Sequence, residues 1–380
     1  MNAIRVVPTP TCITISNGCS TPHVSCSIYR FAMSFVLVYT LYITPNMLNA
    51  PRPAEIDPRE LTSFSDAGRF AEQFEEVLRG SYGIAIKKGS DLEAVSLDLM
   101  FLEDFRLGKG RPDPTTDVRP ILGRAAGWLE FVQLLLRAHQ EKKLAVFVPH
   151  LQLLNEAKVV AQNRRSQISH EADNKLFEMF IALCCTPFCD EVTLDHPHNA
   201  KGNNPDVLAV SGGTKWGFAC KVLNGASPIT MFERLEEGIK QIEVSPADTG
   251  FVFFNFKNIL DHRRAWPIVN EDACLRAADT PTYGSWPDRR IVLSQLEECV
   301  NARWKDCIDF NGPKNVLDLF AGKKTMAGAA VYMATSTSIT TSTGPLATML
   351  GQVAIMRSSE VDPKGEAMLA RINDVLKRRC

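Results

Sequence analysis

The spacing of hydrophobic residues changes along the chain, and this change separates a helical part from a part that contains strands. In "DAGRFAEQFEEVLRG" (66–80), Phe70, Phe74 and Val77 fall on one helical face, because they recur at intervals of three and four. The stretches "DLEAVSLDLMFLEDF" and "AAGWLEFVQLLLRAHQEKK" show the same spacing. The pattern therefore predicts a helical accessory domain over residues 51–164.

A different order of elements begins near residue 170. An apolar helix is followed by three short strands, an amphipathic helix and a continuous apolar run typical of a strand buried on both faces. In order, the segments are helix 170–185, strands 190–195, 206–210 and 215–223, helix 227–245 and strand 250–260. The order α-β-β-β-α-β predicts an α/β core, a mixed sheet flanked by helices, over residues 165–270.

The two ends of the chain carry weaker patterns. Residues 31–51 contain no charged residue, but their apolar core is shorter than the roughly 20 residues that a spanning helix needs. We interpret residues 1–50 as a disordered arm or as excess sequence ahead of a true start at Met33 or Met47, without firm evidence for a membrane. Residues 271–380 are predicted to form a C-terminal extension.

Composition limits the possible partners and the compartment. The chain has 45% hydrophobic and 22% charged residues and a formal net charge of −1, so a nucleic-acid site must rest on a local basic patch. The pairs Arg164–Arg165 and Arg263–Arg264 flank the predicted core and are the candidates for phosphate contacts. The eleven cysteines include no CxxC pair, which favours a reducing, cytoplasmic location.

The candidate chemistry centres on "NPDVLAVSGGTKWGFACKVLNG", residues 204–225. Lys221 lies within an apolar strand-like run, where a buried ammonium group needs an anionic partner, and Asp206 is the obvious partner nearby in sequence. On the preceding helix, Glu171 and Glu178 share a face at helical spacing. Glu178, with Glu171 in reserve, is the candidate helix carboxylate.

These residues and this element order resemble the PD-(D/E)xK nuclease superfamily, the restriction-endonuclease-like fold, over roughly residues 165–262. The approach "GGTKWGF" to Lys221 is similar to the lysine-bearing strand of many members, and "DNKLFEMFIAL" looks like their first core helix. The resemblance implies a restriction-endonuclease-like core behind a helical domain. It also implies hydrolysis of DNA phosphodiester bonds with Mg²⁺ or Mn²⁺, and allows for a homodimer.

The resemblance also implies roles for individual residues. Asp206 would be the main metal ligand, with Glu178 and the backbone carbonyl of Cys220 as further oxygen donors, since Mg²⁺ prefers oxygen. Lys221 would orient the attacking water or stabilise negative charge on the phosphate. Gln241, on the following helix, would lie near the phosphate.

The chain departs from the family two residues before the lysine, where Ala219 replaces the usual acidic residue. Two interpretations compete. In the first, a carboxylate has moved to a neighbouring element, with Glu178, Asp195 and Glu243 as candidates. In the second, the fold has lost catalysis and binds nucleic acid or a protein. On the first interpretation, a glutamate restored at position 219 would add a carboxylate beside Asp206.

Two other motifs suggest different chemistry, and neither is favoured. Asp195, His196 and His198 could suggest zinc, but no further His or Cys lies at zinc spacing, so a solvated loop is the better interpretation. "NVLDLFAGKK" (315–324) resembles the first motif of S-adenosylmethionine-dependent methyltransferases. However, Lys323 occupies the stretch where that motif needs a second glycine.

Overall fold

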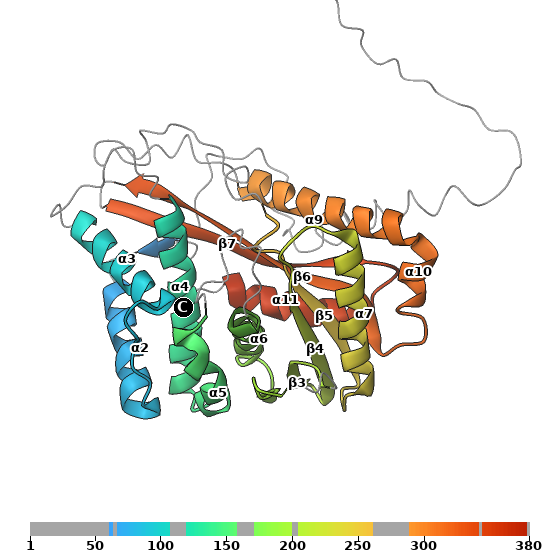
Figure 1. The fold of residues 1–380 in the computed structure, drawn as a ribbon, viewed down its shortest axis with the longest axis horizontal. Helices are drawn as coiled ribbons and strands as arrows, with labels where there is room; N and C mark the ends of the chain where they lie inside the picture. The colour runs from blue at the N-terminus through green and yellow to red at the C-terminus, as the bar shows by residue number, and fades with distance from the viewer. Residues whose placement is uncertain are drawn as a thin grey trace, which may run out of the picture. The chain divides into compact units, whose positions relative to one another are not determined.

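The computed structural model describes seven stretches of the chain, all within the compact unit Pro51–Cys380 (Figure 1). These stretches are residues 61–63, 67–106, 119–157, 171–199, 204–260, 289–341 and 344–377. The predicted N-terminal arm and the basic pairs Arg164–Arg165 and Arg263–Arg264 lie outside the described residues. None of the described helices has the combination of length and apolarity that crossing a bilayer requires.

The helices predicted for the first half of the chain are present. Buried Phe74 packs edge-on against Trp128 of a later helix, with ring centroids 5.5 Å apart, as expected for an apolar stripe facing a core. The elements are α2 (Ala67–Tyr82), α3 (Asp91–Arg106), α4 (Arg119–Gln140), η3 (Leu144–Phe147), α5 (Val148–Leu151) and η4 (Gln152–Asn155).

The predicted order α-β-β-β-α-β is also present. Strands β2, β3 and β4 pair antiparallel in sequence order, and β5 pairs with β4 in parallel after the crossover through α7. Gly212 and Gly213 have φ of 58° and 77°, as a tight turn between β3 and β4 requires. The elements are α6 (Glu171–Cys185), β2 (Glu191–Leu194), β3 (Val207–Ser211), β4 (Thr214–Val222), α7 (Pro228–Val244) and β5 (Thr249–Asn255).

The C-terminal part of the chain completes the same sheet. The strand order is β1-β7-β6-β5-β4-β3-β2, with β6 parallel to β5 and the β6–β7 hairpin extending toward α3 and α4 (Figure 1). The motif at 315–324 begins inside helix α10, so no strand leads into its glycine. The remaining elements are β1 (Leu61–Ser63), α9 (Arg289–Asn311), α10 (Pro313–Asp318), β6 (Thr325–Thr341), β7 (Gly344–Arg357) and α11 (Pro363–Lys377).

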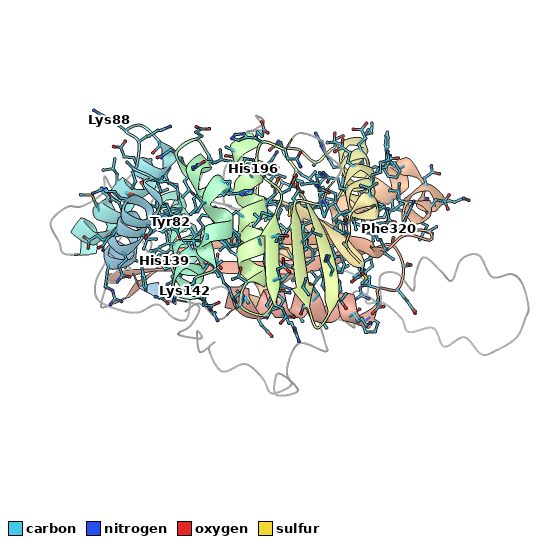
Figure 2. All side chains as sticks on the ribbon, turned by 90° about the horizontal axis from the view of Figure 1, so that it is seen from below. Tyr82, Lys88, His139, Lys142, His196 and Phe320 are labelled. Carbon is cyan, nitrogen blue, oxygen red and sulfur yellow. The ribbon has the colours of Figure 1, made fainter. Side chains whose placement is uncertain are left out.

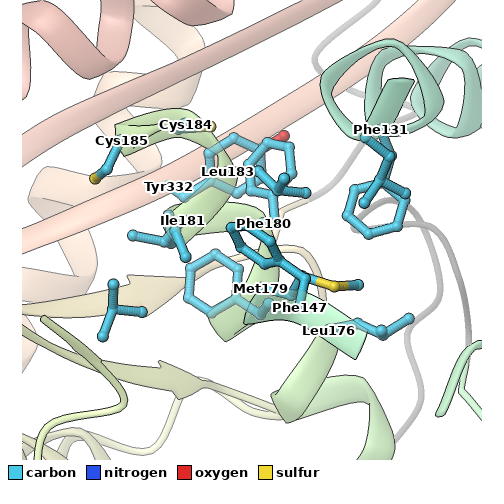
Figure 3. Close-up of a cluster of buried hydrophobic side chains, with 14 of the residues drawn as sticks. Phe131, Phe147, Leu176, Met179, Phe180, Ile181, Leu183, Cys184, Cys185 and Tyr332 are labelled. Carbon is cyan, nitrogen blue, oxygen red and sulfur yellow. The ribbon is translucent and has the colours of Figure 1, made fainter. Parts of the chain in front are cut away.

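One hydrophobic cluster joins the N-terminal helices to the sheet (Figure 3). Phe180 of α6 is at its centre, with its ring centroid 4.9 Å from that of Tyr332 on β6 and 6.4 Å from that of Phe131 on α4. Every residue of α6 from Leu176 to Cys185 is buried, which explains its nearly continuous apolar sequence. The domain boundaries proposed from the sequence stay predictions.

Helices α6 and α7 pack against β4 from opposite faces of the sheet. Phe218 and Cys220 belong to the cluster that contains α6, whereas Ala219 lies under Gly238 of α7. A Cβ atom placed on Gly238 would lie 2.8 Å from Val252 Cγ2 and 3.3 Å from the Cβ of Ala219, so the glycine permits a close approach of helix and sheet. Side chains from both faces can therefore meet only at the end of the sheet.

Candidate functional site

Asp206 lies where strands β3 and β4 separate. The last register pair before this point is Val207 with Phe218. Beyond it, the backbone N–H of Cys220 donates to Asp206 Oδ2 at 2.6 Å. In a continued β-ladder this N–H would donate to a backbone carbonyl of the neighbouring strand, and here the carboxylate takes the place of that carbonyl. The backbone carbonyl of Asp206 accepts a hydrogen bond from the N–H of Asp195 at 2.9 Å. Asp206 is buried, and its carboxylate is fixed between two strands.

Glu178 of α6 places a second buried carboxyl group beside Asp206. Burial raises the pKa of Glu178 to about 7. Burial, and then the neighbouring charge of Glu178, raise the pKa of Asp206 to about 7. Two neighbouring carboxyl groups that share a desolvated position attract a cation or a proton.

Lys221 has both a hydrogen-bond partner and the anionic neighbours that a partly buried ammonium group requires. Its Nζ donates to Gln241 Oε1 of α7 at 2.8 Å, and its charge lowers the pKa of both Glu178 and Asp206 against the effect of burial. Lys221 is half-buried, so this charge acts at reduced solvent screening. The structure thus brings together the four side chains that the sequence singled out, from α6, the start of β3, β4 and α7.

Two further residues of this site were not predicted from the sequence. Lys175 lies one helical turn before Glu178, and its Nζ is 3.0 Å from both carboxylate oxygens. His150 of α5 is buried, and its Nε2 lies 3.7 Å from Glu178 Oε2. The i, i+3 spacing could have indicated Lys175. His150 had no such signal, because it belongs to the segment interpreted as an accessory domain.

The other carboxylates considered from the sequence have different surroundings. Glu243 Oε1 accepts from the N–H and the hydroxyl of Thr325, both at 3.0 Å, so it ties α7 to β6. Asp195 accepts two hydrogen bonds from Asn199 Nδ2, at 2.8 and 3.0 Å, and borders the site. Glu171 is exposed at the first residue of α6. Of the three candidates for a moved carboxylate, Glu178 is the one whose carboxyl group interacts with that of Asp206.

Ala219 and Cys220 have packing roles. Ala219 is fully buried beneath α7, and a larger side chain there would meet the helix near Gly238. The thiol of Cys220 is buried toward α6, where burial raises its pKa well above the ordinary value. The Cys220 backbone N–H, described above, holds Asp206.

Asp206 and Glu178 together form the candidate site for a divalent metal ion. Mg²⁺ is held in proteins by one or two carboxylates together with waters, and Asp206 and Glu178 offer two adjacent, buried groups of this kind. Within the described stretches there is no group of three or more His, Cys, Asp or Glu side chains that could hold a metal ion. Among the described residues, a divalent ion here would have only these two carboxylates as side-chain ligands, and water would complete its coordination shell.

The loop between β2 and β3 carries two histidines at the border of this site. His196 and His198 are both exposed, with ring centroids 5.5 Å apart, and Figure 2 shows His196 separate from the Tyr82–His139 pair of the helical part. The charge of His196 lowers the pKa of His150, so the loop lies close to the buried groups. This geometry agrees with a solvated loop.

Comparison of the chain with protein-family models, with curated proteins and with solved structures found no match.

Proposed function

We propose that this chain is a metal-dependent nuclease with a restriction-endonuclease-like core that hydrolyses DNA phosphodiester bonds. The observation that carries the proposal is the meeting of Asp206, Glu178 and Lys221 at the point where β3 and β4 separate. The order α6-β2-β3-β4-α7-β5 supports it, because the sequence resemblance implies the element order α-β-β-β-α-β in a mixed sheet.

In this proposal, Asp206 and Glu178 would hold Mg²⁺ or Mn²⁺. The ion would supply positive charge to the phosphate and would lower the pKa of the attacking water. Each carboxylate is held in place by a contact within the chain. The amide of Cys220 fixes Asp206, and the ammonium group of Lys175 fixes Glu178. Both contacts favour the deprotonated form that a metal ligand needs.

Lys221 and Gln241 act on the phosphate. Gln241 holds the Lys221 ammonium group at 2.8 Å, so the positive charge is in place before a substrate arrives. A preorganised charge of this kind stabilises the negative charge that develops on a phosphate during hydrolysis. Gln241 would therefore orient Lys221 toward the phosphate.

Incubation of the purified chain with plasmid, linear duplex and single-stranded DNA tests the proposal, in MgCl₂, MnCl₂ or EDTA. The matched controls are Asp206→Asn and Lys221→Met, together with Lys240→Met, which removes an exposed lysine elsewhere on α7. We expect metal-dependent cleavage by the parent and by Lys240→Met only. Equal cleavage by all four proteins would identify a contaminant and end the enzyme proposal.

A second function, a non-catalytic module that binds nucleic acid or a protein, is favoured by a specific observation. Lys175 neutralises Glu178 without a metal, and Ala219 supplies no third carboxylate. Such a module would bind DNA with an affinity that falls as salt rises and does not depend on Mg²⁺. Calorimetry that detects one Mn²⁺ per chain, lost in Asp206→Asn, would count against it.

A further inference from the structure

His150 is a buried polar side chain without a hydrogen-bond partner within the described part of the chain. It is 1% exposed, and neither Nδ1 nor Nε2 has a partner. Buried polar atoms in proteins almost always have a protein or water partner, so this imidazole requires a physical explanation. The flanking residues Phe147 and Leu151 are fully buried, and they anchor the short helix α5 that carries the ring.

The surroundings of the ring point to Glu178. His150 Nε2 is 3.7 Å from Glu178 Oε2, which is too long for a direct hydrogen bond. Burial, and then the charges of Lys175 and His196, lower the pKa of His150 to about 4, while Asp206 and Asp195 oppose this shift. A neutral imidazole has one donor and one acceptor nitrogen, so it can bond to a water molecule with either one.

We propose that His150 is a positioning residue of the site, and that its imidazole and the Glu178 carboxyl group hold one water molecule between them. Two polar atoms at this separation can both reach hydrogen-bond distance from a single water. The water would orient the Glu178 carboxyl group next to Asp206. The consequence for metal binding rests on the proposed function, but the contact itself does not.

A double-mutant cycle in metal-free protein tests the contact. The variants are His150→Leu, Glu178→Met and the double variant, and urea unfolding gives the unfolding equilibrium constant of each. We expect the two substitutions to be non-additive by about fivefold or more in this constant, because contacting residues couple. His139→Leu is the control, since His139 contacts Tyr82 at 3.4 Å on the helical part (Figure 2) and, within the described part of the chain, has no hydrogen bond or ion pair with Glu178.

The effects of His139→Leu and Glu178→Met on the unfolding constant should be additive. If the effects of His150→Leu and Glu178→Met are additive as well, the proposal is overturned. If His150→Leu does not fold, His150→Met replaces it, because methionine adapts to irregular core space and has no nitrogen donor or acceptor. The effects of His150→Met and Glu178→Met should then be non-additive by the same factor of about fivefold or more. Additive effects of these two substitutions would overturn the proposal.

Manganese affinity, measured by calorimetry with MnCl₂, tests the consequence for the site. Outer-shell partners of metal ligands typically contribute about 10–100-fold in affinity, so His150→Leu should weaken Mn²⁺ binding by this factor. His150→Gln should recover most of the loss, and His139→Leu should bind as the parent does. Parent-like affinity in His150→Leu would overturn the positioning role. Absence of Mn²⁺ binding in the parent would instead refute the proposed metal function, and the metal-free cycle would still decide the contact.

Discussion

The close approach of α7 to the sheet at Gly238 makes Gly238→Ala the most informative single substitution. A Cβ atom there would lie 2.8 and 2.9 Å from the two γ-carbons of Val252. Carbon atoms in contact normally lie about 3.5–4.0 Å apart, so either the helix or the strand has to shift. Val252 is fully buried on β5 and β-branched, and its side chain therefore has little freedom to turn away.

The expected magnitude follows from two opposing effects. Overpacking of a closely packed core costs about 1–3 kcal/mol, whereas alanine in place of glycine inside a helix contributes up to about 1 kcal/mol of stability. Gly238→Ala should therefore reduce the free energy of unfolding by about 1–2 kcal/mol. Gly80→Ala is the matched control, because Gly80 is in helix α2 with no atom near the added Cβ, and it should stabilise the chain.

Urea unfolding followed by circular dichroism measures both variants, and Val252→Ala in the Gly238→Ala background should recover part of the loss. Since α7 also carries Gln241, the shifted helix should weaken its 2.8 Å contact with Lys221 and lower any cleavage activity. A Gly238→Ala variant as stable as Gly80→Ala, or one that Val252→Ala does not rescue, would show that the helix does not approach the sheet this closely.

Three further predictions concern the carboxylate site. Lys221→Met should lower the cleavage rate by about 10²–10³-fold with folding retained, measured by plasmid nicking, and a parent-like rate would remove Lys221 from the mechanism. The raised pKa values of Asp206 and Glu178, about 7 each, mean that the folded state binds more protons than the unfolded state between roughly pH 4 and 7, so stability should fall as pH rises through this window. Urea unfolding of the parent and of an Asp206→Asn, Glu178→Gln double variant should show a flatter profile in the variant; identical profiles would contradict the shifts. Ala219→Glu should destabilise the chain by roughly 3 kcal/mol or more, through overpacking and a buried charge, without creating a Mn²⁺ site, and calorimetry that finds new Mn²⁺ binding would refute this.

Some members of the site could be read from the sequence because local periodicity places them. Glu178 follows from helical spacing on an apolar helix, and Asp206 and Lys221 follow from their positions at the ends of two adjacent strands. Lys175 was within reach of the same argument, since it lies one turn before Glu178. We expected a carboxylate at position 219 to join the site, and nothing in the neighbouring sequence argued against this. The packing of α7 over Ala219 now argues against this expectation.

The sequence by itself determined the order of helices and strands over residues 171–255, because repeating hydrophobic patterns and turn glycines act over a few residues. Only the tertiary structure decided that β6 and β7 complete the sheet, that His150 lies beside Glu178, and that the two carboxylates share one desolvated space. These contacts join residues far apart in the chain. No local pattern records such contacts, since they result from the packing of α4, α5 and α6 around one hydrophobic cluster.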